Sequence, residues 1–200
     1  MQTYKKYIAE FIGTFFLALI VGFASKSGLS ITPILAGVVL MLTVYGIGSI
    51  SGAHINPGVT LGLLSVRKIS VRDAAWYIVA QIVGALAAVA VMKGMYPEMA
   101  VTLMGTANNV KMLIAETIGM IFFAWGIAAI VFGKHSDGTS GVMIGGSLTI
   151  GIFIALFLGS GGGLNPAVVL AVDSFNWAYI IGPVLGSVIG MNLYKYLAHK

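Results

Sequence analysis

Six long apolar runs follow one another along the chain, separated by short polar or glycine-rich stretches. Each run has close to the roughly 20 residues that a helix needs to cross about 30 Å of hydrocarbon. None of them alternates apolar with polar positions as a barrel strand does, so the pattern predicts helices, which satisfy their own backbone inside a membrane. The predicted spans are residues 7–25, 34–50, 74–92, 112–132, 142–159 and 177–197.

Two shorter apolar pieces remain, residues 56–65 and 165–173, and each begins with an Asn-Pro pair. Asparagine is a strong helix N-cap, and proline is favoured at the first helical position. Ten helical residues rise about 15 Å, which is half the thickness of the hydrocarbon. We therefore predict two re-entrant half-helices that enter from opposite faces, with the preceding glycines permitting left-handed backbone beside a lumen.

The chain repeats itself at about half its length. Glu10 recurs as Glu116, 106 residues on, and the two Asn-Pro pairs are 109 residues apart. Because three spans per half is an odd number, the halves must be inverted relative to each other, and paired interruptions of this kind indicate a site at mid-bilayer depth. We predict one all-α membrane domain over residues 1–200, with an inverted 3+3 repeat at about 1–98 and 105–200.

Composition supports a membrane protein and excludes several other classes. The chain is 58% hydrophobic and 8% charged, whereas soluble domains are about 25% charged. The net charge of +5 comes from residues scattered through loops, without the basic stripe of a nucleic-acid-binding protein. With both termini on one side, that side has eight of the eleven basic residues, which predicts cytoplasmic termini in a cell (inner) membrane.

No pattern typical of an enzyme is present. The chain has no cysteine, and its histidines and carboxylates lack metal-ligand spacing. No nucleophile lies in a recognisable relation to a base. We therefore expect no enzymatic activity, no metal and no cofactor.

Three segments resemble the aquaporin and aquaglyceroporin (major intrinsic protein) family over nearly the whole chain. They are Ala9-Glu10-Phe11-Ile12-Gly13-Thr14-Phe15, Ser51-Gly52-Ala53-His54-Ile55-Asn56-Pro57 and Gly163-Leu164-Asn165-Pro166-Ala167. The resemblance implies a passive channel for water and small uncharged solutes, such as glycerol-like polyols, with neutral metalloid acids as further candidates. It also implies a homotetramer in membrane lipid, with one pore in each protomer.

The expected pore centre is formed by the two asparagine motifs, Asn56, Pro57, Gly58, Asn165, Pro166 and Ala167. Each half-helix N-terminus behaves like roughly +0.5 charge, so two that meet would repel cations. Each asparagine is expected to cap its helix with its oxygen and to donate an N–H to passing water. An ionisable residue within a span usually has a partner, and the resemblance implies that Glu10 and Glu116, with His54, support the re-entrant loops.

The selectivity filter differs from that of water-selective family members. Matched by distance from the asparagines, its positions here are Ala36, Phe153, Gly162 and Val168. Val168 occupies the place where those members have arginine, so we expect an apolar, roomier and uncharged constriction that favours larger neutral solutes. An apolar ring narrowed by Phe153 would alternatively dewet and conduct poorly.

Two other functions remain open at this stage. One is a secondary transporter on the same inverted-repeat scaffold, and the other is a poorly conducting structural membrane protein. Small residues also form two stripes, which allow close helix contact; we expect this contact to join the two halves, with general apolar packing as the alternative. The stripes are Gly182, Gly186 and Gly190, and Ala80, Gly84 and Ala88.

Overall fold

The computed structural model describes residues 3–97, 110–133, 137–171 and 176–198. Within these ranges all of the regular secondary structure is helical, and there are no strands. Six helices there are long and apolar enough to cross a membrane, and each predicted span falls on one of them. The six are α1 (Thr3–Lys26), α2 (Thr32–Ser51), α4 (Val71–Met95), α5 (Val110–Phe132), α6 (Asp137–Phe157) and α8 (Ala178–Ala198). The chain is thus an integral, multi-pass membrane protein.

The two predicted half-helices are also present. They are α3 (Pro57–Ser65) and α7, which is described from Pro166 to Ala171. Each begins at the proline of its Asn-Pro pair, so both predicted starting points are confirmed. Residues 172 and 173 at the predicted end of the second half-helix, and residues 98–105 where the halves were expected to join, lie outside the described residues.

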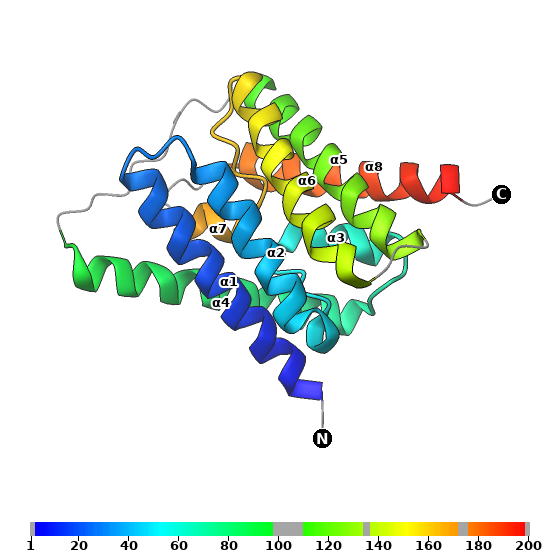
Figure 1. Ribbon diagram of the computed structural model, residues 1–200, viewed down its shortest axis with the longest axis horizontal. Helices are drawn as coiled ribbons and strands as arrows, with labels where there is room; N and C mark the ends of the chain where they lie inside the picture. The colour runs from blue at the N-terminus through cyan, green and yellow to red at the C-terminus, as the bar shows by residue number, and fades with distance from the viewer. Residues whose placement is uncertain (1–2, 98–109, 134–136, 172–175, 199–200) are drawn as a thin grey trace.

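The long helices form a row in the contact order α1, α2, α6, α5, with α4 against the outside of α1 and α8 against the outside of α5. Figure 1 shows α1, α2, α6 and α5 side by side, with α4 and α8 crossing behind them. Each half therefore contributes two helices to the row and one to the layer behind, as the inverted repeat predicts.

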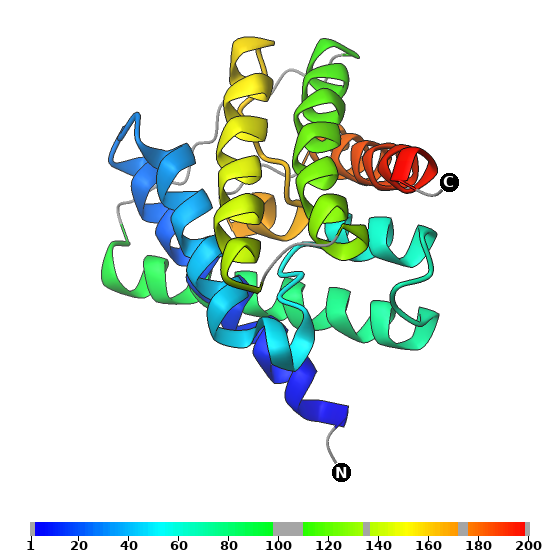
Figure 2. The same cartoon turned by 45° about the vertical axis from the view of Figure 1, so that its right-hand side comes forward.

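Each half-helix packs chiefly on the opposite half. Helix α3 lies mainly against α8, and α7 lies against α4 and α1. Figure 2 shows α7 (orange) in the middle of the molecule and α3 (teal) between α8 and α4. The direct α2–α6 contact and these two crossed contacts hold the halves together.

The small-residue stripes pack within halves, so the prediction that they join the halves is wrong. A Cβ added at Gly186 of α8 would lie 2.4 Å from the Thr117 carbonyl oxygen of α5, and one at Gly84 of α4 would lie 2.4 Å from the Phe11 carbonyl oxygen of α1. A small-residue stripe indicates close approach but does not identify the neighbouring helix. The halves do meet at another glycine, because a Cβ on Gly145 of α6 would lie 2.4 Å from the Gly37 carbonyl oxygen of α2.

The outer surface is apolar along the helices. On α8 the exposed side chains recur every four residues, as Ile181, Leu185, Ile189 and Leu193. An apolar stripe on the outside of a bundle is costly in water and favourable against lipid tails. This surface agrees with the membrane location that the six spans indicate.

We predict that Gly186→Ala lowers the free energy of unfolding by about 1–3 kcal/mol, because the added methyl group forces α8 away from α5. The matched control is Gly146→Ala in α6, where an added Cβ meets no atom within 4 Å. That change is expected to be neutral or to stabilise the helix by up to about 1 kcal/mol. Thermal unfolding in detergent, followed by circular dichroism, measures both, and equal effects of the two variants would contradict the tight α5–α8 contact.

Candidate functional site

The two asparagines cap the two half-helices. The side-chain oxygen of Asn56 accepts a hydrogen bond from the backbone N–H of Gly58 at 2.8 Å, and that of Asn165 accepts from Ala167 at 3.0 Å. Each therefore satisfies one of the N–H groups that a helix start leaves unpaired, which matters most where no water is present.

The side-chain amides also join the two motifs directly. The Nδ2 of Asn56 donates to the carbonyl oxygen of Leu164 at 2.9 Å, and the Nδ2 of Asn165 donates to that of Ile55 at 2.9 Å. The N-termini of α3 and α7 therefore meet at one place in the middle of the protein. Each amide has a second N–H, and both asparagines line the same cavity, so two donors are available to its contents.

The residues just before the asparagines have left-handed backbone. Ile55 has a φ of 40° and Leu164 a φ of 41°. Such a conformation in a branched, non-glycine residue costs of the order of 1–3 kcal/mol and persists only where the surroundings enforce it. It turns the carbonyls of Ile55 and Leu164 toward the opposite asparagine.

Glu10 holds the first of these loops. Its carboxylate is fully buried and accepts four hydrogen bonds. Two come from the backbone N–H groups of His54 at 2.9 Å and Ile55 at 2.6 Å. The other two come from the Ser51 hydroxyl at 2.7 Å and the Gln81 amide at 2.8 Å.

Glu116 does the same in the second half. It is also fully buried, and it accepts the backbone N–H groups of Gly163 at 3.0 Å and Leu164 at 2.7 Å, together with the Ser160 hydroxyl. These contacts fit the loop-supporting role expected for both glutamates. Our sequence reasoning missed Ser51 and Ser160, although their separation of 109 residues, the same as that of the asparagines, was a usable signal.

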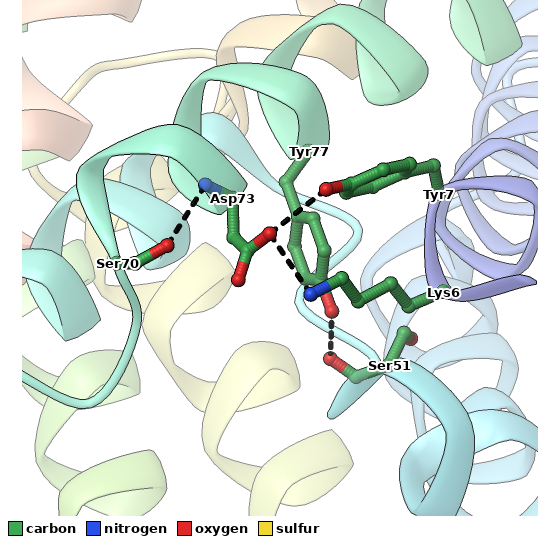
Figure 3. Close-up of polar contacts among 6 residues, drawn as sticks. All are labelled: Lys6, Tyr7, Ser51, Ser70, Asp73 and Tyr77. Carbon is green, nitrogen blue, oxygen red and sulfur yellow. Dashed lines mark hydrogen bonds and ion pairs between the residues drawn. The ribbon is translucent and has the colours of Figure 1, made fainter. Parts of the chain in front are cut away.

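A group of polar and aromatic side chains supports the first loop from the ends of α1 and α4. The Tyr77 hydroxyl donates to the Ser51 carbonyl at 2.7 Å, and the Tyr7 ring meets the Tyr77 ring edge-on with centroids 5.9 Å apart. The Tyr7 hydroxyl and the Lys6 ammonium each lie 2.8 Å from the same Asp73 oxygen. Figure 3 shows these contacts converging beside the loop, so α1 and α4 are joined where the loop begins.

His54 contributes its ring as well as its backbone. The ring Nδ1 lies 3.2 Å from the Thr60 hydroxyl of α3, and the ring packs edge-on against Tyr77 with centroids 4.9 Å apart. The side chain is nearly buried and reaches the cavities described next. This placement fits the buttressing role expected for His54.

Two cavities lie on either side of the asparagine motifs. One has a volume of about 250 Å³ and is lined by both asparagines and by aliphatic side chains of α1, α2 and α6. The other has a volume of about 590 Å³ and extends past Gly52 and Ala53 to Lys68 and Ser140. Among the described residues, Leu40, His54 and Phe123 line both cavities, so the two cavities lie next to each other at these three side chains.

Three of the four expected filter residues line the smaller cavity: Ala36, Gly162 and Val168. Phe153 does not; it is partly exposed and stacks on Phe157, with ring centroids 6.0 Å apart. Ile152 lines the cavity instead. This corrects our placement of Phe153. Counting back from Asn165 through the glycine loop does not fix the rotation of α6, and a shift of one residue turns a helical side chain by about 100°.

The fold and the site together define a polytopic membrane protein with an inverted repeat and two half-helices that meet at a mid-membrane passage. A family model described as Major intrinsic protein matches residues 1–194. The chain belongs to this family.

Named relatives agree with this assignment. The chain is 32% identical to the Glycerol uptake facilitator protein-like 6 of Lactiplantibacillus plantarum, over 92% of this chain and 94% of that protein. It is also 32% identical to Aquaporin AqpM of Methanothermobacter thermautotrophicus, over 98% of both. The X-ray structure of the aquaglyceroporin from Plasmodium falciparum has the same fold, with a TM-score of 0.70 at 20% identity over 96% of this chain and 95% of that one.

We predict that Glu116→Gln distorts the second loop. The NH₂ group of the glutamine amide is a donor, so it cannot accept the backbone N–H hydrogen bonds that the carboxylate oxygen accepts. Each buried donor left unpaired costs about 1–3 kcal/mol. The measurement is thermal unfolding in detergent, combined with osmotic water permeability in liposomes, and both should fall. Asp73→Asn is the control, since its amide oxygen still accepts from the Tyr7 hydroxyl and the partly exposed ion pair with Lys6 that it removes contributes about 0–1 kcal/mol. A loss as large as that of Glu116→Gln would contradict the supporting role.

Proposed function

We propose that the chain is a passive channel that conducts water and small uncharged solutes of the glycerol type down their gradients. The observation that carries the proposal is the pair of 2.9 Å hydrogen bonds by which Asn56 and Asn165 each bind the opposite loop, beside a cavity that both line. Membership of the Major intrinsic protein family, and the similarity to a glycerol uptake facilitator-like protein and an aquaporin, support it.

The geometry provides an electrostatic barrier to cations. Both half-helices point their N-termini at the same place, and each terminus behaves like roughly +0.5 charge. A cation that reaches mid-membrane has lost much of its hydration when it meets this field. Among the described residues no carboxylate lines the cavity, because Glu10 and Glu116 are turned to the loops. A neutral solute instead presents its oxygen to the two asparagine amides.

We infer that Ala36, Ile152, Gly162 and Val168 form the filter ring at the outer end of this path. Their side chains are aliphatic or absent, so the ring offers no charge and no side-chain hydrogen bond. The backbone around Gly162, which has a φ of 70°, provides the nearby polar groups. Such a ring admits neutral solutes by size more than by charge.

The structure offers little for an ion-coupled transporter. Among the described residues, the buried carboxylates are Glu10 and Glu116, and the backbone of the loops occupies both. A coupling ion would need a free carboxylate or a set of carbonyls beside the discontinuous helices. A passive channel requires neither, so it is the better account of the site, and we propose no enzymatic activity.

We further propose a homotetramer in the cell (inner) membrane, with both termini in the cytoplasm. Among the described residues, six basic side chains lie on the proposed cytoplasmic side: Lys5, Lys6, Arg67, Lys68, Arg72 and Lys195. Lys26, Lys93 and Lys111 lie on the other. This bias follows the positive-inside rule.

Stopped-flow light scattering of proteoliposomes tests the channel directly. We predict water and glycerol permeabilities above those of empty liposomes, without saturation and unchanged by sodium or proton gradients. Flux that required either gradient would replace the channel with a transporter.

The filter is tested by Val168→Arg. We predict a lower ratio of glycerol to water permeability, because a larger, charged side chain enters a ring that is now aliphatic. Val168→Met repeats the narrowing without a charge, should the arginine variant not fold. Ratios equal to that of the wild type in both variants would place the filter elsewhere.

The absence of cysteine allows a topology test with single introduced thiols. Ser27 and Gly138 are exposed at opposite ends of the long helices, and an added Cβ at Gly138 meets no atom within 4 Å. We predict that a membrane-impermeant maleimide labels Ser27→Cys in intact cells, and labels Gly138→Cys only after permeabilisation. The reverse pattern would place the termini outside.

A further inference from the structure

We propose that a neck formed by Leu40, His54 and Phe123, and not the filter ring, sets the size limit for solutes. This inference rests on the proposed channel function. The four ring residues all line one undivided cavity. The neck residues line both that cavity and the next one, which places the narrowest part of the proposed path between them.

The side chains at the two levels differ in size. Ala36 of the ring has a single methyl group and Gly162 has no side chain, whereas the neck has leucine and phenylalanine. The ring also lacks the arginine that would fill its centre, because Val168 stands there. A solute that passes the ring therefore still has to pass the bulkier neck.

The neck walls have little freedom to move aside. Leu40 is 2% exposed and Phe123 is 1% exposed, and both belong to the main apolar core. Phe123 is backed by α6, where a Cβ on Gly151 would lie 3.3 Å from the Phe123 Cβ. Close-packed cores of this kind resist displacement, so the opening is fixed by the side chains themselves.

His54 gives the neck one polar side. The Thr60 hydroxyl donates to the Asn56 carbonyl at 3.0 Å, which assigns the ring proton to Nδ1 as the donor to Thr60. The Nε2 atom is then an acceptor, and it lies beside Gly52, which lines the larger cavity. The neck thus has two apolar walls and one hydrogen-bond acceptor, close to the amide donors of the asparagines.

This arrangement suits slim solutes with an apolar side and a hydroxyl side. Their CH groups would pass along Leu40 and Phe123. Their hydroxyls would replace hydrogen bonds to water with hydrogen bonds to the asparagine amides and the imidazole. A longer linear polyol fits in the same orientation, and its passage is limited by the width that Phe123 leaves. Widening the neck should therefore increase the permeability of larger polyols more than that of water or glycerol.

The test compares ribitol and glycerol permeabilities in proteoliposomes of the wild type and of Phe123→Leu. We expect the ribitol-to-glycerol ratio to rise severalfold in Phe123→Leu, and Leu40→Val gives a second, milder widening should the first variant not fold. The matched control is Phe122→Leu, one residue away and 44% exposed on the lipid side, which should keep the wild-type ratio.

The outcomes separate this inference from the proposed function. A wild-type protein that conducts neither water nor glycerol above empty liposomes refutes the channel. A conducting wild type whose ratio changes with neither Phe123→Leu nor Leu40→Val refutes the neck. A ratio that rises with Ile152→Ala but not with the neck variants makes the filter ring limiting, and this also overturns the proposal.

Discussion

The constraint on which the structure depends is the need to pair every backbone polar group where no water is present. Re-entrant loops break helical pairing at mid-membrane depth, and each orphaned N–H there costs several kcal/mol. Glu10 and Glu116 meet this need, because a carboxylate only accepts and has two oxygens for several donors. Each one binds the two N–H groups that precede an asparagine, and so fixes the direction in which that asparagine points.

A second level of pairing connects the halves. The amide of each asparagine binds the carbonyl that the opposite loop turns toward it, so neither loop is satisfied without the other. The packing follows the same logic, since α3 lies against α8 and α7 against α4 and α1. The passage is therefore a product of both halves, and it forms only when they are assembled.

Sequence alone indicated the polar parts of this site more directly than the apolar parts. An Asn-Pro pair or a glutamate in an apolar run is so costly that its presence indicates a role, whatever its neighbours. Leu40 and Phe123 give no such signal, because an aliphatic or aromatic residue is equally suitable toward lipid, core or lumen. Phe153 was misplaced because the rotation of the helix before the glycine-rich loop is set by packing. The partners of the small-residue stripes were misassigned because such a stripe does not identify the neighbouring helix.

In the proposed channel, the valine at position 168 becomes understandable once solutes are selected by charge at one place along the path and by size at another. At Asn56 and Asn165 the field comes from backbone dipoles and capped helix starts, which no side-chain change at the ring removes. At the proposed neck, the width comes from core side chains that packing holds in place. In the proposed channel, Val168 therefore widens the ring and extends the range of neutral solutes there, while the half-helices exclude cations.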